Sequence, residues 1–177
     1  ERVLVVDLDP QGNATSGLGL DKSGTSTADL LDGAPLESVV RRTQFANLDA
    51  VPASPDLAGS AAELGRRDAS ERYLADALAP ARARYDFVFL DCPPSLGPLT
   101  VNALAAADRV LVPVQAEYYA MEGLAQLLQT IVAAKSRGAA VALIAHRMSV
   151  LAVSDKILVM RDGRVLHHHT QNVRGTP

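Results

Sequence analysis

The chain has 177 residues and a formal net charge of −3, with 48% hydrophobic and 21% charged residues. Aromatic residues make up only 4%, so this composition predicts one soluble globular domain with an aliphatic core of Ala, Val and Leu. The net negative charge gives no general footprint for nucleic acid, and DNA binding would need a local patch or an assembly. The single Cys92 excludes an internal disulfide framework, and no apolar run reaches the length of a spanning helix; we therefore expect a cytoplasmic protein.

Predicted strands and helices alternate from the first residues onward. Glu1 leads directly into the apolar run 3–6, without an initiator Met or a signal segment, so we expect the sequence to begin inside a longer protein. This run is typical of a strand buried on both faces of a parallel sheet. The later predicted elements are helical turns at 27–31 and 36–42, a strand at 48–51, a helix at 70–84, a strand at 87–90, a helix at 99–107, a strand at 110–114, a helix at 121–134 and a strand at 141–145. Their alternation predicts an α/β fold with a doubly wound, mostly parallel sheet.

The pattern changes after His146. Residues 157–160 and 164–166 flank an Asp-Gly turn, which predicts a C-terminal β-hairpin. Three adjacent histidines follow at 167–169. Adjacent residues cannot all face one ion, so we expect a solvated end there in place of a metal site.

Carboxylates follow two of the predicted strands. Asp7 and Asp9 close the first strand, and Asp91 closes the strand 87–90. Ligands of open α/β sheets bind beyond the carboxyl ends of strands, so acids placed there can hold hydrated Mg²⁺ or orient an attacking water. The alternative is that these residues only terminate strands and begin turns.

Two long motifs carry a family resemblance. VLVVDLDPQGNATSGLG at 3–19 closely resembles the segment that follows the first helix in ParA, Soj and MinD-type deviant-Walker ATPases. YDFVFLDCPPSLG at 85–97 resembles the Walker B strand and switch of the same family, and later short motifs extend the match to about residue 130. The resemblance implies a P-loop NTPase fold and a partition ATPase that dimerises on ATP and positions chromosome, plasmid or other cargo.

The resemblance also implies roles for individual residues. Asp91 would bind Mg²⁺ through water, Asp9 would position the water that attacks the γ-phosphate of ATP, and Asp7 would support the nucleotide site. The remaining residues expected beside the nucleotide are Gln11, Gly12, Asn13 and Pro93, the last opening a γ-phosphate-sensing segment at 93–97. Expected partners are a second copy, a ParB-like stimulating protein and non-specific DNA, the last contacted by a region that this sequence does not contain.

The phosphate-binding loop of this class is missing from the sequence. Phosphoryl transfer needs a G-x-x-x-x-G-K-[ST] loop whose amides and Lys hold the phosphates, but no Gly-Lys dipeptide occurs here. The lysines Lys22, Lys135 and Lys156 all lie outside such a pattern. In the family this loop lies upstream of the position of Glu1, so we expect a fragment that is inactive by itself.

A second resemblance covers about residues 133–166. The stretches 133–138, 141–147 and 155–165 resemble the end of an ABC transporter ATPase of the type I secretion exporters. This resemblance implies that His146 is a switch histidine that reaches a γ-phosphate; the alternative is that His146 merely ends a strand. We therefore expect a ParA-like body at 1–132 without its Walker A loop, an ABC-like segment at 133–168 packed in the same domain, and a tail at 169–177.

Two other functions remain open at this point. An ABC transporter ATP-binding subunit would explain His146 and the hairpin, but the chain has no L-S-G-G-Q signature, and Cys92 stands where that class places a catalytic Glu. A catalytically silent composite chain is the third possibility.

Overall fold

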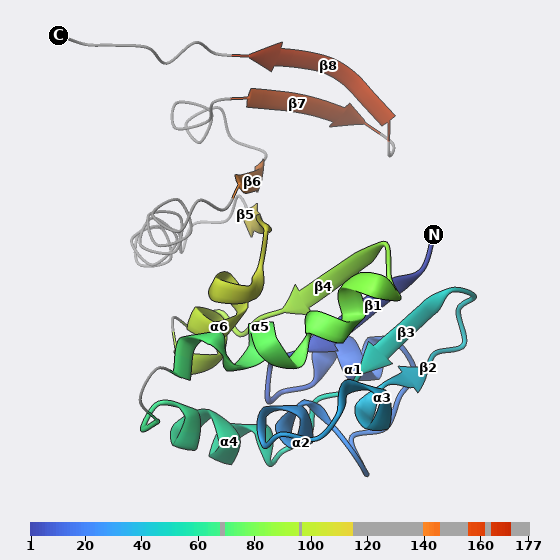
Figure 1. Cartoon of the computed structure of the whole chain (residues 1–177). Coiled ribbons are helices and arrows are strands. Elements are labelled where there is room, and N and C mark those ends of the chain that lie inside the picture. Colours follow the sequence, from blue (N-terminus) through green and yellow to red (C-terminus); the bar gives the residue numbers. More distant parts are fainter. Residues whose placement is uncertain (68–69, 96, 115–139, 146–155, 162–163, 171–177) are drawn as a thin grey trace, which may run out of the picture.

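The computed structural model describes residues 1–67, 70–95, 97–114, 140–145, 156–161 and 164–170 (Figure 1). The strands are β1 (Val3–Asp7), β2 (Arg41–Arg42), β3 (Leu48–Val51), β4 (Phe87–Asp91), β5 (Arg109–Val114), β6 (Ala140–Ala145), β7 (Lys156–Arg161) and β8 (Arg164–Thr170). The helices are α1 (Asn13–Gly17), α2 (Thr27–Leu31), α3 (Leu36–Val39), α4 (Leu57–Leu64), η1 (Ser70–Arg72), α5 (Tyr73–Ala77), η2 (Ala79–Ala83) and α6 (Pro98–Ala106), with η marking 3₁₀ helices.

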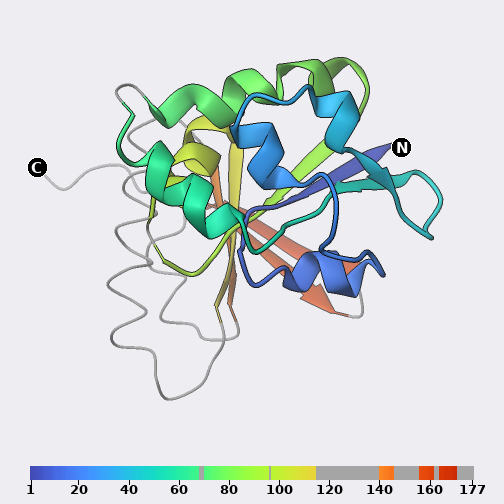
Figure 2. The ribbon, with the colours of Figure 1, turned by 90° about the horizontal axis from the view of Figure 1, so that it is seen from below.

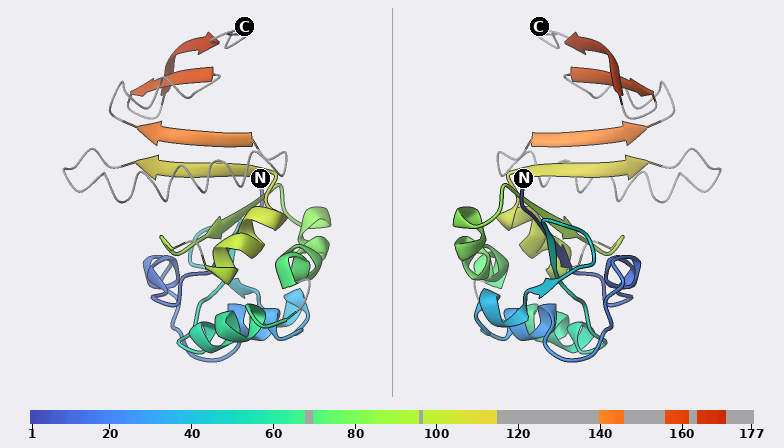
Figure 3. Two further views of the ribbon diagram at one scale, coloured as in Figure 1. Left: turned by 90° about the vertical axis from the view of Figure 1, so that its left-hand side faces the viewer. Right: turned by 90° about the vertical axis from the view of Figure 1, so that its right-hand side faces the viewer.

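The main sheet has the strand order β2-β3-β1-β4. Strand β1 pairs in parallel with β3 and with β4, whereas the short edge strand β2 is antiparallel to β3. Strands β5 and β6 form a separate parallel pair, and β7 and β8 form an antiparallel hairpin (Figure 3). The predicted α/β class with a mostly parallel sheet and a C-terminal hairpin is confirmed, although the strands are divided among three hydrogen-bonded sheets.

Helices cover the two faces of the main sheet unequally. Helix α1 lies on one side, and α2, α4 and α5 lie on the other (Figure 2). In β1, Leu4 and Val6 are completely buried, whereas Val3 and Val5 are half-buried. The expectation of a strand buried on both faces therefore holds for one face only, because one short helix leaves the other face partly open.

The core lies between the main sheet and the larger helical layer. Its members are almost all aliphatic, as the low aromatic content predicts, and its largest fully buried side chains include Leu8, Leu30, Leu31, Leu36, Leu57, Leu64 and Leu74. Burial of a Leu side chain stabilises a fold by about 1.5–3 kcal/mol, so these leucines hold the helical layer on the sheet.

Among the described residues, no strand pairs with β4 on the side opposite β1. Its side chains alternate between exposed and half-buried, and Phe87 and Phe89 are each about half exposed. Their rings stack with centroids 6.5 Å apart, so the two aromatic side chains cover part of each other.

Several predicted boundaries are wrong. The helix expected at 70–84 is divided into η1, α5 and η2. Pro80, the second residue of η2, cannot continue the α-helix that ends at Ala77. The helix expected at 36–42 ends at Val39, because Val40 is extended and Arg41 begins β2. Helices α1 and α4 were not predicted at all.

The C-terminal hairpin is longer than predicted. Strand β8 continues through Thr170, and His167, His168 and His169 pair there with residues of β7. All three histidines therefore belong to a strand of the hairpin. The predicted helix 121–134 and His146 lie outside the described residues.

Candidate carboxylate site at the sheet edge

The parallel register of β1 and β4 brings two of the predicted acids together. Asp7 pairs with Asp91 at the carboxyl ends of these strands, and the Leu8 N–H donates to the Asp91 carbonyl at 2.8 Å. Asp9 follows in the loop directly after β1. Asp9 and Asp91 therefore lie at the same edge of the sheet, beyond the carboxyl ends of two parallel strands.

Asp7 is the buried member of this group, with a relative exposure of 1%. One carboxylate oxygen accepts from the Thr15 hydroxyl at 2.6 Å and the Thr15 N–H at 2.8 Å, and the other accepts from the Asp9 N–H at 3.1 Å. The Thr15 hydroxyl in turn accepts from the Ala53 N–H at 2.9 Å. Asp7 thus ties α1 and the loop after β3 to the end of β1, and its oxygens face protein donors.

Asp9 is half-buried and organises the loop that follows it. Its carboxylate accepts from the Gln11 N–H at 2.9 Å, and its carbonyl accepts from the Gly12 N–H at 2.8 Å. Gly12 has φ +61°, a left-handed conformation that suits glycine, and it is the N-cap of α1. The exposed Gln11 and Asn13 flank this turn. The loop therefore places three of the predicted residues directly beside Asp9.

The charge of the three acids is not balanced nearby. Within the described part of the chain, no ion pair reaches Asp7, Asp9 or Asp91. Although Asp91 lies at the surface, partial burial of its carboxyl group and then the negative charges of Asp7 and Asp9 raise its pKa above the ordinary value. A cation that binds here would lower the electrostatic energy of the group.

The donor set fits Mg²⁺ better than a tightly caged metal. Carboxylate oxygens suit this hard cation, which normally keeps several waters and takes other ligands from phosphates. Among the described residues no group of three or more His, Cys, Asp or Glu side chains could hold a metal ion. The exposed Asp91 and the half-buried Asp9 could therefore hold Mg²⁺ only together with water or a phosphorylated ligand.

The segment after β4 is anchored to α6. The Thr100 hydroxyl donates to the Ser95 carbonyl at 2.7 Å, and the half-buried Pro93 precedes this anchor.

Burial, followed by the Asp91 charge, raises the pKa of the Cys92 thiol to about 12, so Cys92 remains protonated at neutral pH.

Two residues at this edge were not predicted. Thr15 donates hydrogen bonds to the Asp7 carboxylate from its hydroxyl and its backbone N–H. The stem of Lys22 lies over Gly12, and its ammonium donates to the Gln11 carbonyl. Thr15 belongs to the motif at 3–19, but no local pattern distinguishes it, because its partners Asp7 and Ala53 lie 8 and 38 residues away along the chain. In the sequence, Lys22 lies outside any phosphate-loop pattern, and nothing else in its surroundings indicates a role.

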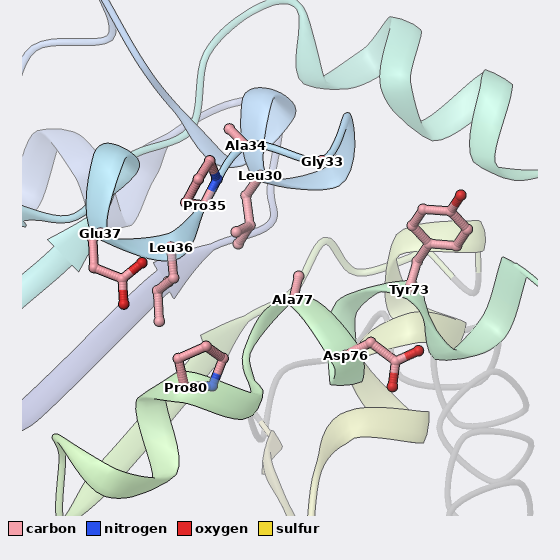
Figure 4. A pocket seen from close by; sticks show the side chains of 10 residues that line it. All are labelled: Leu30, Gly33, Ala34, Pro35, Leu36, Glu37, Tyr73, Asp76, Ala77 and Pro80. Carbon is pink, nitrogen blue, oxygen red and sulfur yellow. The ribbon is translucent and has the colours of Figure 1, made fainter.

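A separate groove of about 390 Å³ lies between α2, α3 and the α5–η2 segment (Figure 4). Leu30, Leu36 and Ala77 form part of its apolar wall, while Glu37 and Asp76 lie at its edge. It contains none of the predicted site residues, so it is distinct from the carboxylate site.

No described helix is long and apolar enough to cross a bilayer.

The comparisons with known proteins give a consistent family. Residues 1–145 match the family described as the AAA domain. The chromosome partitioning protein ParA of Myxococcus xanthus is 53% identical over 133 residues, which cover 73% of this chain and 47% of the relative. The sporulation initiation inhibitor protein Soj of Bacillus subtilis is 49% identical over 134 residues, which cover 74% and 53%.

A solved structure is also similar to this chain in fold and sequence. The protein named cobyrinic acid a,c-diamide synthase of Mycobacterium smegmatis, solved with a bound ATP analogue and magnesium, has a TM-score of 0.72 and 41% identity. The alignment covers 80% of this chain and 59% of that one. The chain spans about half the length of the curated relatives it matches. From the family match over most of its length, we conclude that the chain belongs to the AAA domain family.

Proposed function

We propose that this chain forms the hydrolytic sheet edge of a ParA-type partition ATPase. The observation that carries the proposal is the parallel pairing of Asp7 with Asp91, which places Asp9 and Asp91 at one edge of the sheet. The similarity to proteins named ParA and Soj supports this function. The structural relative solved with an ATP analogue and magnesium supports the choice of ligands, ATP and Mg²⁺.

The two open carboxylates take different roles in this proposal. Asp91, exposed at the end of β4, holds Mg²⁺ through water, and Asp9 orients the water that attacks the γ-phosphate. Bound Mg²⁺ neutralises charge on the phosphates. The buried Asp7 supports both residues by fixing the end of β1.

The neighbouring loops shape the nucleotide site. Gln11, Gly12 and Asn13 form the turn beside Asp9, and Pro93 begins a segment that responds to the γ-phosphate. The amides and the Lys of a G-x-x-x-x-G-K-[ST] loop would come from residues that this sequence does not contain.

The proposed partners follow from the family. A second copy would pair with the ATP-bound form, a ParB-like protein would stimulate hydrolysis, and non-specific DNA would bind a part of the protein beyond this sequence. An ABC transporter subunit is less well supported, because the similar proteins carry partitioning names and His146 lies outside the described residues.

A chimera tests the proposed function. In this chimera, the N-terminal segment that precedes the matched region of the Myxococcus xanthus relative is joined to Glu1. The added segment is expected to supply the phosphate loop. We expect Mg²⁺-dependent ATP hydrolysis that Asp91→Ala abolishes, while Asp86→Ala, a surface acid at the opposite end of β4, leaves the rate within about twofold. A chimera that unfolds cooperatively in urea but does not hydrolyse ATP would contradict the proposal.

A further inference from the structure

We propose that Lys22 is a positioning residue that holds the Asp9 loop in its working conformation, an inference that rests on the proposed function. Lys22 lies in the connection between α1 and α2, and its ammonium donates a hydrogen bond to the Gln11 carbonyl. The Gln11 N–H donates to the Asp9 carboxylate at 2.9 Å. Gln11 is therefore bonded on one side to Lys22 and on the other to Asp9.

The stem of Lys22 completes the contact by lying over Gly12. A Cβ atom added to Gly12 would be 2.7 Å from Lys22 Cε and 3.1 Å from both Cδ and Nζ. Gly12 is buried and left-handed, with φ +61°, and its N–H donates to the Asp9 carbonyl. Glycine at this position meets two requirements, a positive φ and the space that the lysine stem occupies.

Lys22 binds the backbone and leaves the Asp9 charge free. No ion pair joins Lys22 to Asp9 among the described residues, although both contact the Gln11–Gly12 turn. A lysine that neutralised Asp9 would weaken it as a partner for a water or a cation. Bonding to a carbonyl fixes the loop without that effect.

Arg41 of β2 holds the segment that carries Lys22. Its guanidinium donates to the Thr25 carbonyl at 2.7 Å, to the Ser23 carbonyl, and to the Asp21 carbonyl at 3.3 Å, and it pairs with the Asp21 carboxylate at 3.4 Å. A Cβ atom on Gly24 would lie 2.9 Å from this guanidinium. The Arg41–Lys22 brace, defined by these contacts, connects the edge strand β2 to the loop of Asp9.

Amide hydrogen exchange of the 177-residue chain tests the brace without any nucleotide. The variants are Lys22→Ala, Lys22→Met, which keeps much of the stem, Lys22→Arg, which keeps a charged donor, and Arg42→Ala as the control. Arg42 is exposed and adjacent to Arg41, and no hydrogen bond or ion pair of its side chain occurs among the described residues. Urea unfolding of each variant separates local opening from a loss of global stability.

Lys22→Ala is expected to speed exchange of the Gln11 and Gly12 amides by about fivefold to tenfold, as the loss of one hydrogen bond and its covering stem allows. Lys22→Met should be intermediate, and Lys22→Arg and Arg42→Ala should stay within about twofold of the parent chain. Unchanged exchange of both amides in Lys22→Ala would overturn the brace.

The same variants in the phosphate-loop chimera test positioning. Lys22→Ala should lower kcat about tenfold while the KM for Mg²⁺-ATP stays within about twofold. Asp9 acts on the attacking water after the nucleotide has bound, so a misplaced Asp9 loop slows hydrolysis and leaves binding largely unchanged. Lys22→Arg should restore kcat to within about threefold of the parent. Faster exchange without a fall in kcat, or no rescue by Arg, would overturn the positioning role. Absence of hydrolysis in the folded parent chimera would overturn the proposed function and this role with it, while the exchange result still decides the brace.

Discussion

The Asp7 carboxylate and the Thr15 hydroxyl form a 2.6 Å hydrogen bond in the interior of the protein, at the same edge of the sheet as Asp9 and Asp91. Thr15 also accepts from the Ala53 N–H, so one side chain joins β1, α1 and the segment after β3. The bond keeps a buried negative charge supplied with donors. Burial of a carboxylate without hydrogen-bond donors has a high cost in free energy. The Asp7–Thr15 hydrogen bond therefore contributes both to the stability of the fold and to the geometry of the carboxylate site.

Thr15→Val should therefore destabilise the fold. The change keeps the shape of the side chain but removes a donor to Asp7 and an acceptor for Ala53, and we expect a loss of about 2–4 kcal/mol in the free energy of unfolding. Thr15→Ser keeps the hydroxyl and should lose less than about 1.5 kcal/mol. Urea denaturation at neutral pH measures both values. A loss in Thr15→Val no larger than the loss in Thr15→Ser would contradict the role of the hydroxyl.

Gly12→Ala should cost more than Gly19→Ala, although both glycines have a positive φ, +61° and +74°. A left-handed alanine costs about 1–2 kcal/mol at either site. At Gly12 the new methyl must also displace Lys22, which removes its hydrogen bond to Gln11, for a further cost of about 1 kcal/mol; at Gly19 the nearest atom lies at an ordinary 3.5 Å. Unfolding free energies of the single and double variants form the measurement.

In a Lys22→Ala background, the extra cost of Gly12→Ala should disappear, because the methyl then has space and no hydrogen bond remains to be lost. Strict additivity of the two changes would mean that Lys22 and Gly12 do not interact.

Tyr85 should give the protein a specific loss of stability at alkaline pH. Its hydroxyl donates to the Asp49 carboxylate at 2.9 Å, and burial, followed by that hydrogen bond and the Asp49 charge, raises its pKa above 10.0. The folded state therefore retains the Tyr85 proton at a pH at which the unfolded state loses it. The resulting stabilisation is fully present below pH 10 and declines as the pH rises through the folded pKa.

Tyr85→Phe removes this dependence. It should be less stable than the parent chain by about 1 kcal/mol at neutral pH, and the difference should shrink as the pH rises above 10. Urea denaturation of both chains across this range measures the difference, in which the titration of the other groups cancels. A difference that stays constant or widens with pH would contradict the raised pKa.

Asp9→Ala and Asp91→Ala should impair different steps in the phosphate-loop chimera. Asp9→Ala is expected to slow hydrolysis by about 10²-fold or more and to leave ATP binding largely intact, since Asp9 acts on the attacking water. Asp91→Ala should weaken Mg²⁺-dependent binding itself. Single-turnover rates together with titration calorimetry separate the two effects, and small, equal effects on both steps would refute the division of roles.

The 177-residue chain by itself should neither hydrolyse ATP nor bind it usefully. Asp7, Asp9 and Asp91 bring negative charge to the place of the phosphates, and the sequence contains no phosphate-loop lysine to offset it. Even one hydrogen bond from His146 would contribute only about 1.5–3 kcal/mol, whereas micromolar binding requires about 8 kcal/mol. Titration calorimetry with Mg²⁺-ATP measures this directly. A micromolar dissociation constant that Asp91→Ala abolishes would mean that the chain has a phosphate site of its own.

Local sequence patterns account for the parallel strands of the main sheet and for the positions of the acids along them. Apolar runs predicted β1 and β4, and Asp7, Asp9 and Asp91 directly follow or end these strands, because local hydrophobicity decides which residues form buried strands. The end of α5 before η2 also has a local cause in Pro80, which cannot continue an α-helix.

Only the tertiary structure decided which acid is buried and which residues hold the site. Asp7 and Asp9 are two residues apart, yet Asp7 faces the Thr15 donors while Asp9 remains half-buried in the loop. Lys22 reaches Gln11, and Arg41 reaches the segment of Lys22, through contacts 11 and 16 to 20 residues apart in the chain. These contacts depend on how the loops pack after the sheet has formed, and no local pattern of hydrophobicity or spacing encodes them.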